Sequence, residues 1–281
     1  MIWKFRDREF DLTKRGLIVG ILNTTPDSFS DGGLFLNPNE AVKHGLKLIA
    51  DGADILDIGG ESTRPGSESV GEEEEMSRVL PVIKALRAVT DVPFSIDTSK
   101  ASVADAALEA GADIINDVTA LCGDARMGEV AASRGAGLIL MHMQGRPQTM
   151  QLNPSYAEDD VVRTVAKFLS ERRAAAIGFG VDAAAITLDP GLGFGKTMAH
   201  NLALLRGIPE LVTLGSPLMI GHSRKSFLGK IKGLGAVQDR GLAAAVALTG
   251  LAYASGARLF RVHEAAPHRE ALRVTEAVFS S

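Results

Sequence analysis

The stretch VPFSIDTSKASVADAALEAGADIINDV, residues 92–118, holds two short apolar runs on either side of an alanine-rich segment. The runs 92–98 and 112–118 are rich in Val, Ile and Phe, as buried strands are, and the segment between them has the apolar spacing of a helix. A strand, a helix and a second strand in this order form the unit from which parallel sheets are built. The stretch therefore predicts an α/β fold with a parallel sheet.

The same alternation continues along the whole chain. Eight apolar runs predict strands, at residues 16–23, 53–59, 92–98, 112–118, 136–143, 185–190, 217–222 and 258–263. Segments with helical spacing lie between and after them, at residues 39–50, 72–89, 99–110, 157–176, 237–254 and 265–278. From Asn23 to His263 there are 240 residues in seven strand-to-strand intervals, about 34 residues each, which suits a βα repeat and leaves no room for a second domain.

We expect a single (β/α)₈ TIM barrel, one domain spanning residues 1–281. The competing fold is a doubly wound open sheet, which normally carries a glycine fingerprint at its first strand-to-helix turn. That fingerprint is missing from this sequence. Residues 1–14 alternate charged and apolar side chains, so we expect them to form a short hairpin that covers the bottom of the barrel.

Composition and charge argue against several classes of protein. The apolar content of 46% is enough for a large core, and the net charge of −4 is not gathered into blocks, so we expect no nucleic-acid partner. Charged residues interrupt the first ten positions, and no apolar stretch is long enough to cross a bilayer, so we expect neither export nor membrane insertion. Cys122 is the only cysteine, which excludes an internal disulfide and favours a cytoplasmic protein.

Polar residues follow nearly every predicted strand at its C-terminal end. They are Asn23, Glu61, Asp97, Asn116, Asp117, His142, Asp189, residues 223–225, Arg261 and His263. In a barrel these ends converge on one mouth, where the active sites of this fold lie. An Asp or Asn after a strand also caps the next helix in many proteins, and Asp97 before Thr98 leaves that alternative open. Taken together, the placement predicts an enzyme.

Two long segments, 24–37 and 61–71, are rich in Ser, Thr and Gly. We expect them to be loops that act as lids and offer hydroxyls, backbone N–H groups and Arg64 to an anionic ligand. Ordinary turns are the alternative. The acidic run 72–75 predicts a solvent-exposed first helical turn.

Three familiar motifs are absent from the sequence, although two segments resemble parts of them. The segment GKT at 195–197 lacks the first glycine of a phosphate-binding P-loop, and GHSRK at 221–225 lacks the final glycine of a nucleophile elbow. The six histidines have no spacing typical of a metalloprotease. Neither an ATP site, a serine hydrolase nor a tightly held transition metal is supported.

Eight local strings occur in order along the chain. They are GILNTTPDSFSDGG (20–33), GGESTRPG (59–66), SIDTSK (95–100), IIND (114–117), LMHMQG (140–145), DPGLGFGK (189–196), GHSRKS (221–226) and RVHE (261–264). Together they resemble the dihydropteroate synthase family over nearly the whole sequence, with mild departures at Thr24 and His222. The resemblance implies a transferase, a sulfonamide target, that condenses 4-aminobenzoate with (7,8-dihydropterin-6-yl)methyl diphosphate. Dihydropteroate and diphosphate would be the products, on the folate pathway.

The resemblance also implies a role for each site residue. The pterin would be bound by Asp97, Asn116, Asp189, Lys225 and Arg261. The diphosphate would be bound by Asn23, Thr63, Arg64, Arg261 and His263, with Asn23 also ligating Mg²⁺. Aminobenzoate would lie near Phe29, Thr63, Pro65, Phe194 and Ser223. Catalysis would fall to Asp97, Lys225, Arg261 and His263, which would stabilise the departing diphosphate and a pterin cation without a protein nucleophile.

Two rival functions share part of this pattern. A methyltransferase with the same barrel would pass a methyl group from a reduced folate to a corrinoid partner, and it would lack the diphosphate residues. A non-catalytic pterin-binding paralogue would lack one or more catalytic positions, yet none is missing here. The segment 237–254 is apolar on nearly every side, which predicts a homodimer through this face, burial under another helix being the alternative.

Overall fold

Eight parallel strands form a ring in a computed structural model that describes residues 1–25, 38–62, 67, 69–156, 160–231 and 241–279. The strands are β3 (Leu17–Asn23), β4 (Ile55–Gly59), β5 (Phe94–Asp97), β6 (Ile114–Asp117), β7 (Gly137–Met141), β8 (Ile186–Asp189), β9 (Met219–Gly221) and β10 (Leu259–Val262). Seven parallel pairings join them in the order β8-β7-β6-β5-β4-β3-β10-β9. A parallel bridge between Leu188 and Leu218 joins the two ends of that order. The expected TIM barrel is confirmed, and each strand lies inside its predicted run.

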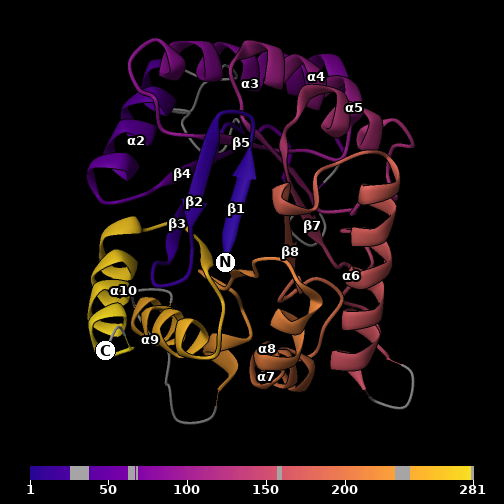
Figure 1. Cartoon of the computed structure of the whole chain (residues 1–281), viewed down its shortest axis with the longest axis vertical. Coiled ribbons are helices and arrows are strands. Elements are labelled where there is room, and N and C mark those ends of the chain that lie inside the picture. The colour runs from indigo at the N-terminus through magenta and orange to yellow at the C-terminus, as the bar shows by residue number, and fades with distance from the viewer. Residues whose placement is uncertain (26–37, 63–66, 68, 157–159, 232–240, 280–281) are drawn as a thin grey trace.

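Helices surround the ring of strands (Figure 1). They are α2 (Pro38–Ala50), α3 (Glu72–Arg87), α4 (Ala101–Ala110), α5 (Met127–Arg134), α6 (Val161–Gly178), α7 (Met198–Arg206), α8 (Ile208–Leu211), α9 (Leu242–Ala254) and α10 (Ala265–Phe279). Helix α6 begins after Asp160, whose side chain accepts the N–H of Arg163 and caps the helix. Residues 157–159 and 237–240, the first parts of two predicted helices, lie outside the described residues.

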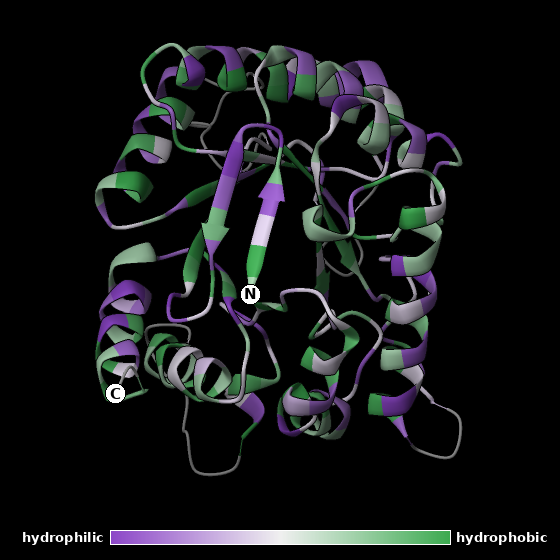
Figure 2. Ribbon diagram, in the orientation of Figure 1, coloured by the Kyte–Doolittle hydropathy of each residue, from purple (hydrophilic) through white to green (hydrophobic). Residues whose placement is uncertain are grey.

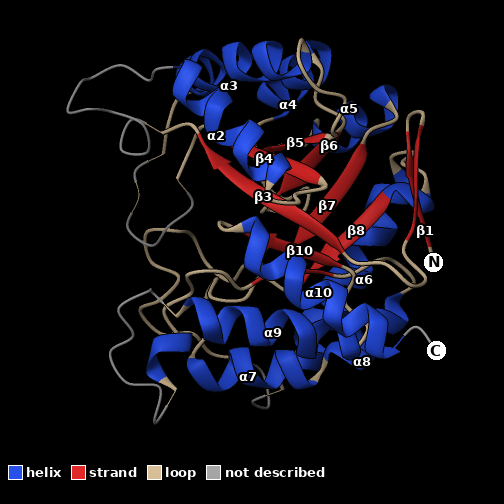
Figure 3. Cartoon of the chain, turned by 90° about the vertical axis from the view of Figure 1, so that its left-hand side faces the viewer, coloured by secondary structure: helices blue, strands red, loops and turns tan. Residues whose placement is uncertain are grey.

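The N-terminal residues form the expected hairpin, in which β1 (Ile2–Phe5) pairs antiparallel with β2 (Arg8–Asp11). Polar and apolar residues follow one another along it (Figure 2). Trp3 and Phe5 point inward and are buried, and the Trp3 indole N–H donates to the carbonyl of Ala185 at 3.0 Å. The hairpin lies beyond the end of the barrel at which the strands begin (Figure 3). It therefore covers the bottom of the barrel and leaves the opposite end to the functional site.

Both faces of the central strands are covered, and every residue of β4 to β8 is buried. The apolar side chains among them join one continuous core that reaches from Trp3 to Leu272. Polar residues in these strands are therefore held inside the protein, where each needs a partner or a purpose. Among the described residues, no helix has the length and apolar character needed to span a membrane.

The acidic run at 72–75 begins α3 as expected, but one of its members is not exposed to solvent. Glu75 is wholly buried, and one of its carboxylate oxygens accepts a hydrogen bond from Lys100 Nζ at 2.5 Å. Lys100 also pairs with Glu61, directly after β4. The expectation of an exposed turn is therefore wrong for Glu75, because that carboxylate faces the barrel and not the solvent.

Candidate active site

A cavity of about 1710 Å³ opens at the carboxyl ends of the strands. Nine of the predicted site residues line it, namely Asn23, Asp97, Asn116, Asp189, Phe194, Ser223, Lys225, Arg261 and His263. The other four, Phe29, Thr63, Arg64 and Pro65, lie outside the described residues. The cavity is larger than the volume of roughly 300–1,000 Å³ usual for one small ligand, so two substrates fit side by side.

A buried ion-pair network occupies the floor of the cavity. The guanidinium of Arg261, on β10, donates to Asp57 Oδ2 and to Asp97 Oδ2, both at 2.6 Å. Asp57 also accepts hydrogen bonds from Ser95 Oγ at 2.5 Å and from Asn116 Nδ2 at 3.2 Å. Burial acts to lower the pKa of Arg261, but the two carboxylates outweigh it and raise that pKa above its ordinary value. The guanidinium is thus a fixed cation whose charge is already balanced.

Asp57 is a site residue that the sequence analysis missed. It lies in the middle of β4 and is wholly buried, and no strand end or loop draws attention to it. The available signal was a carboxylate inside an otherwise apolar strand, since an unpaired charge there would cost several kcal/mol. Its partners on β5, β6 and β10 explain why it is tolerated.

One oxygen of Asp97 is left for a ligand. Asp97 Oδ1 is buried and has no hydrogen-bond partner among the described residues, while Oδ2 is held by Arg261. The pKa of Asp97 is raised to about 7, chiefly by burial and also by nearby Asp57 and Glu75, while Arg261 opposes the rise. Helix α4 begins after Lys100 without a side-chain cap, so Asp97 does not serve as a helix cap. The orphan oxygen is suited to accept an N–H from a bound molecule.

Asp189 ends β8 on the same cavity. Its Oδ1 accepts the backbone N–H of Gly191 at 2.7 Å, which fixes the carboxylate at the start of a glycine-rich loop. Burial raises the pKa of Asp189 to about 6, although Gly191 and the ammonium of Lys225 oppose the rise. Burial likewise lowers the pKa of Lys225 to about 8. A buried carboxylate and a half-buried ammonium therefore face one another with shifted pKa values, as is common at functional sites.

The glycine-rich loop after β8 lies directly on the end of β7. Gly191 has a φ of +65°, and a Cβ there would come within 2.0 Å of the His142 carbonyl. Gly195 has a φ of +66°, and a Cβ there would come within 2.4 Å of the Gln144 carbonyl. Only glycine permits this approach. It places the ring of Phe194 under Lys225, whose Nζ lies 4.1 Å from the ring centroid.

The segment after β9 brings two predicted subsites together. Arg224 has a φ of +57°, a conformation that side chains rarely adopt, and Ser223 and Lys225 on either side of it both line the cavity. Ser223 Oγ lies 3.0 Å from Nδ1 of His263 and accepts the backbone N–H of His263 at 3.3 Å. The guanidinium of Arg224 pairs with Glu264. The predicted aminobenzoate and diphosphate residues are thus in direct contact here.

Two of the polar strand ends have structural partners. Asp117 is buried, and its carboxylate accepts the backbone N–H groups of Thr119 at 2.8 Å and Leu121 at 2.7 Å. His142 is buried beside Lys196, whose Nζ lies 3.0 Å from its Nδ1. Lys196 is a second residue to which the sequence assigned no role, although it ends the string DPGLGFGK and begins no P-loop.

The donor set at the mouth fits a weakly held Mg²⁺ better than a dedicated metal centre. Among the described residues, no three His, Cys, Asp or Glu side chains come together to hold an ion. Asn23 ends β3 on the cavity and offers a neutral amide oxygen. Magnesium is often held by one or two protein oxygens together with substrate phosphates, and a single Asn fits that mode.

Comparisons with known proteins agree with this site. The family model described as "Pterin binding enzyme" matches residues 19–263, so the fold and the site define a pterin-binding enzyme. A dihydropteroate synthase from Synechocystis sp. is 44% identical over 270 residues, with 96% of this chain and 92% of that protein covered. The chain belongs to the dihydropteroate synthase family.

Solved structures give the same result. A Yersinia pestis dihydropteroate synthase in complex with a sulfonamide drug has a TM-score of 0.92 and 41% identity, with 100% of both chains covered. A dihydropteroate synthase from Xanthomonas albilineans in complex with 7,8-dihydropteroate has a TM-score of 0.87 and 42% identity, again with 100% of both chains covered. The similarity thus extends over the barrel and the cavity at its mouth.

Proposed function

We propose which residues at the barrel mouth of this transferase bind each of its two substrates. Members of the family condense 4-aminobenzoate with (7,8-dihydropterin-6-yl)methyl diphosphate to give 7,8-dihydropteroate and diphosphate, a step of folate biosynthesis. The observation that carries the proposal is Asp97 Oδ1, a buried acceptor that has no hydrogen-bond partner within the described part of the chain and so costs stability until a ligand binds. We further propose that residues 1–281 form one domain and that the enzyme is cytoplasmic, as the lone Cys122 favours.

The pterin would bind across the floor of the cavity. Its ring N–H and amino groups are donors, and the carboxylates of Asp97 and Asp189 are buried acceptors at two strand ends. Lys225 would donate to the pterin carbonyl. Asn116 is bonded to Asp57 through its amide nitrogen, an orientation that leaves its oxygen as the group to accept a further donor. Matched donors and acceptors in a dry pocket favour this bicycle over an aromatic ring without them.

Arg261 would act on the pterin more than on the diphosphate. Its charge is balanced by Asp57 and Asp97, so it offers the flat face of its guanidinium to the ring more readily than a free charge to the phosphates. His263 and Asn23 would then hold the diphosphate, together with Thr63 and Arg64. When bound at Asn23 and the diphosphate, Mg²⁺ would supply charge stabilisation for the leaving group.

The residues present support a dissociative substitution. The bond between the pterin methylene carbon and the diphosphate oxygen breaks, and its electron pair leaves with the diphosphate. His263 would donate to the departing oxygen, and the anionic Asp97 would stabilise the positive charge spread over the pterin. The aminobenzoate nitrogen then attacks the methylene carbon and loses a proton to water. No side chain is required as a nucleophile.

Aminobenzoate would occupy the outer part of the cavity, near Phe194 and Ser223, with Phe29, Thr63 and Pro65 beside it. Because Ser223 contacts His263, the site for the amine forms next to the bound diphosphate. We therefore propose that aminobenzoate binds second. Full aminobenzoate affinity in calorimetry without pterin diphosphate or diphosphate would contradict this order.

A diphosphate-release assay tests the function directly. With Mg²⁺ and pterin diphosphate, release should depend on added 4-aminobenzoate and be matched by dihydropteroate formed. A corrinoid-dependent methyltransferase would release no diphosphate, and a non-catalytic pterin-binding protein would bind the pterin without release. Asp189→Ala serves as a control with reduced release at low pterin diphosphate concentration, because it removes an acceptor for the pterin.

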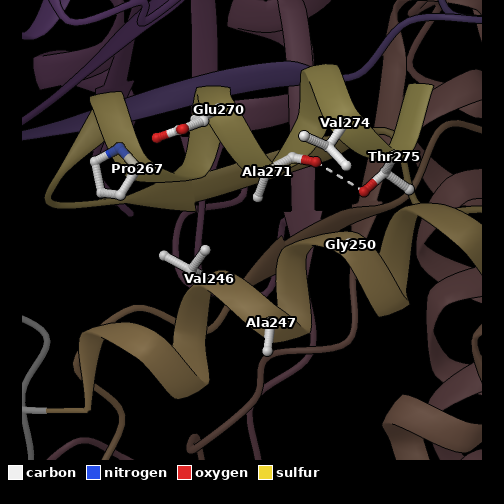
Figure 4. Close-up of a pocket in the computed structure, with 8 residues that line it drawn as sticks. All are labelled: Val246, Ala247, Gly250, Pro267, Glu270, Ala271, Val274 and Thr275. Atoms are coloured by element: carbon white, nitrogen blue, oxygen red, sulfur yellow. Dashed lines mark hydrogen bonds between the residues drawn. The ribbon is translucent and has the colours of Figure 1, made fainter. Parts of the chain in front are cut away.

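We also propose a homodimer through α9 and α10. The two helices pack together and leave a groove lined by Val246, Gly250, Ala271 and Val274 (Figure 4). Leu251 on α9 is 64% exposed, and Val274 on α10 is 63% exposed. Val274 lines the groove, and Leu251 directly follows its lining residue Gly250 in the sequence. Exposed apolar side chains beside a groove are typical of an interface.

Sedimentation tests the dimer. At micromolar concentration the unaltered protein should sediment as a dimer, and Val274→Glu, which places a charge in the groove, should sediment as a monomer. Val89→Glu is the matched control, since Val89 is 61% exposed at the end of α3, outside this groove. A monomeric unaltered protein would overturn the proposal.

A further inference from the structure

Lys196 is a buried lysine of the cavity wall to which the proposed reaction gives no task. Its side chain is held within the protein, with 3% of the residue exposed. Its Nζ donates to the carbonyl of Phe194 at 3.0 Å, to the carbonyl of His142 at 3.3 Å and to Nδ1 of His142 at 3.0 Å. Three acceptors match the three N–H groups of an ammonium, and none of them is a carboxylate.

His142 provides the fixed end of this arrangement. It follows β7 and is buried, and its ring meets Phe168 edge-on with the ring centroids 4.9 Å apart. Burial and the charge of Lys196 lower the pKa of His142 to about 3, so its ring is neutral at ordinary pH and Nδ1 offers a lone pair. Lys196 is therefore attached to a residue that follows β7 and packs on α6, outside the loop after β8.

Phe194 provides the other end. Gly193 and Gly195 flank it with φ values of +82° and +66°, and glycine exchanges such conformations easily. The N–H of Phe194 donates to the carbonyl of Gly191 within the same loop, at 3.1 Å. Within the described residues, the bond from Lys196 ties the Phe194 carbonyl to His142, which follows the neighbouring strand β7.

The rest of the loop has anchors of its own. Tyr156 Oη donates to the carbonyl of Gly195 at 2.8 Å, and the N–H of Gly193 donates to Asn201 Oδ1 at 2.8 Å. A lysine is thus not needed simply to hold the loop in place. Burying an ammonium without a carboxylate is costly, and an apolar residue of similar volume avoids that cost. A lysine at position 196 therefore calls for a role more specific than attaching the loop as a whole.

We propose that Lys196 is a positioning residue for 4-aminobenzoate: it fixes Phe194 so that the phenyl ring forms one wall of the aminobenzoate site. This inference rests on the assignment of Phe194 to aminobenzoate in the proposed function. Lys225 lies over the same ring and also faces Asp189 and Asp97. The charge of Lys196 acts on Asp189 as well, but its hydrogen bonds go to Phe194 and His142 and not to that carboxylate. The main effect of Lys196 should therefore fall on 4-aminobenzoate.

Steady-state kinetics with both substrates tests the inference. Lys196→Met should raise the KM for 4-aminobenzoate about tenfold, the effect of losing a charged hydrogen bond, and leave the KM for pterin diphosphate unchanged. Tyr156→Phe is the matched control, because it removes a different anchor of the same loop, and it should change neither KM. An equal rise of both KM values, no rise, or the same split in Tyr156→Phe would overturn the inference. Should Lys196→Met not fold, Lys196→Gln is judged by the same split.

A double-variant comparison separates this inference from the proposed function. If Lys196 acts through Phe194, then Lys196→Met combined with Phe194→Ala should raise the KM for 4-aminobenzoate no more than Phe194→Ala alone. Additive effects would show that Lys196 acts elsewhere and would overturn the inference. If Phe194→Ala has no effect by itself, the proposed aminobenzoate site is wrong and the inference falls with it. If only Lys196→Met is silent, the proposed site stands and the inference is wrong.

Discussion

The two ends of the barrel treat buried polar groups in opposite ways. At the bottom, the Trp3 indole donates to Ala185, and the Asp113 carboxylate accepts hydrogen bonds from Arg87 at 2.7 Å and from the N–H of Phe94 at 3.0 Å. At the mouth, Asp97 keeps one oxygen that no described residue bonds, and burial raises the pKa of Asp189 to about 6. The bottom satisfies its polar groups, whereas the mouth leaves acceptors open for a ligand.

This difference shows where the protein gives up stability for function. A fully paired group contributes to folding in every state of the enzyme, while an open acceptor costs stability until a substrate reaches it. Changes at the bottom should therefore alter stability without altering chemistry. Changes at the mouth should do the reverse, and some of them should make the protein more stable.

The largest effect is expected at the bottom, for Trp3→Ala. Removing a wholly buried indole and its hydrogen bond should lower the free energy of unfolding by about 3–5 kcal/mol, because the hairpin cannot fill the cavity left behind. At a temperature where the variant stays folded, kcat/KM should match that of the unaltered enzyme. Urea unfolding and kinetics on the same samples measure both, and a variant that is folded but inactive would break the comparison.

The next effect is a gain in stability at the mouth, for Asp189→Asn. With its folded pKa raised from 3.8 to about 6, Asp189 binds a proton more tightly in the folded than in the unfolded state, so its contribution to stability falls as pH rises from about 4 to 6. Asn has no such loss and can still accept the N–H of Gly191. At pH 8 the free energy of unfolding of the variant should be higher by up to about 3 kcal/mol. The gain is smaller to the extent that the ammonium of Lys225 is destabilised by losing the negative charge of Asp189.

Urea unfolding at pH 8 and at pH 4.5 measures this gain. The difference between Asp189→Asn and the unaltered protein should shrink to about 1 kcal/mol at pH 4.5, where Asp189 is mostly neutral in the folded state but still mostly ionised in the unfolded state. Binding of the pterin should be lost, because the NH₂ group of the Asn would face an N–H donor of the pterin and the two cannot form a hydrogen bond. Equal stability of the two proteins at pH 8 would contradict the prediction. It would mean that neighbouring groups offset the cost of burying the charged Asp189 carboxylate.

Much of this contrast could be predicted from the sequence. The apolar runs predicted the strands correctly, because a strand that is covered on both faces needs a nearly continuous apolar sequence. The strand ends gave Asp97, Asp189 and Arg261 because the barrel brings those ends together. The specific roles came from the family resemblance, and they remain predictions.

The missed residues share a physical reason. Asp57 and Lys196 are charged groups surrounded by other elements, and their partners are distant in sequence: Arg261 for Asp57, and His142 for Lys196. Glu75 was assigned to solvent for the same reason, since Lys100 lies on another segment. Local pattern shows where a polar residue stands on its own element, but only the fold shows what faces it.

A smaller effect separates two subsites within the mouth. Asp189→Ala should weaken a simple pterin by on the order of 1–3 kcal/mol, because pterin donors are left unpaired, and should leave diphosphate binding intact. His263→Ala should weaken diphosphate and slow its departure, with little effect on a pterin that lacks the diphosphate. Calorimetry with free diphosphate and with a simple pterin, each with Mg²⁺ at one pH, gives the comparison. The division is wrong if a folded Asp189→Ala loses diphosphate as completely as His263→Ala does.

The smallest effect is expected one layer below the mouth, at Thr187. Its side chain is wholly buried two residues before Asp189 on β8, and its hydroxyl has no hydrogen-bond partner among the described residues. Thr187→Val keeps the shape and removes the unpaired hydroxyl, so it should raise the free energy of unfolding by about 1 kcal/mol. Because the hydroxyl lies below the substrates in this proposal, both KM values should stay unchanged. Asp189 would then be the deepest residue on β8 that contacts a substrate. A rise in the KM for pterin diphosphate would instead extend the functional region one layer deeper into the barrel.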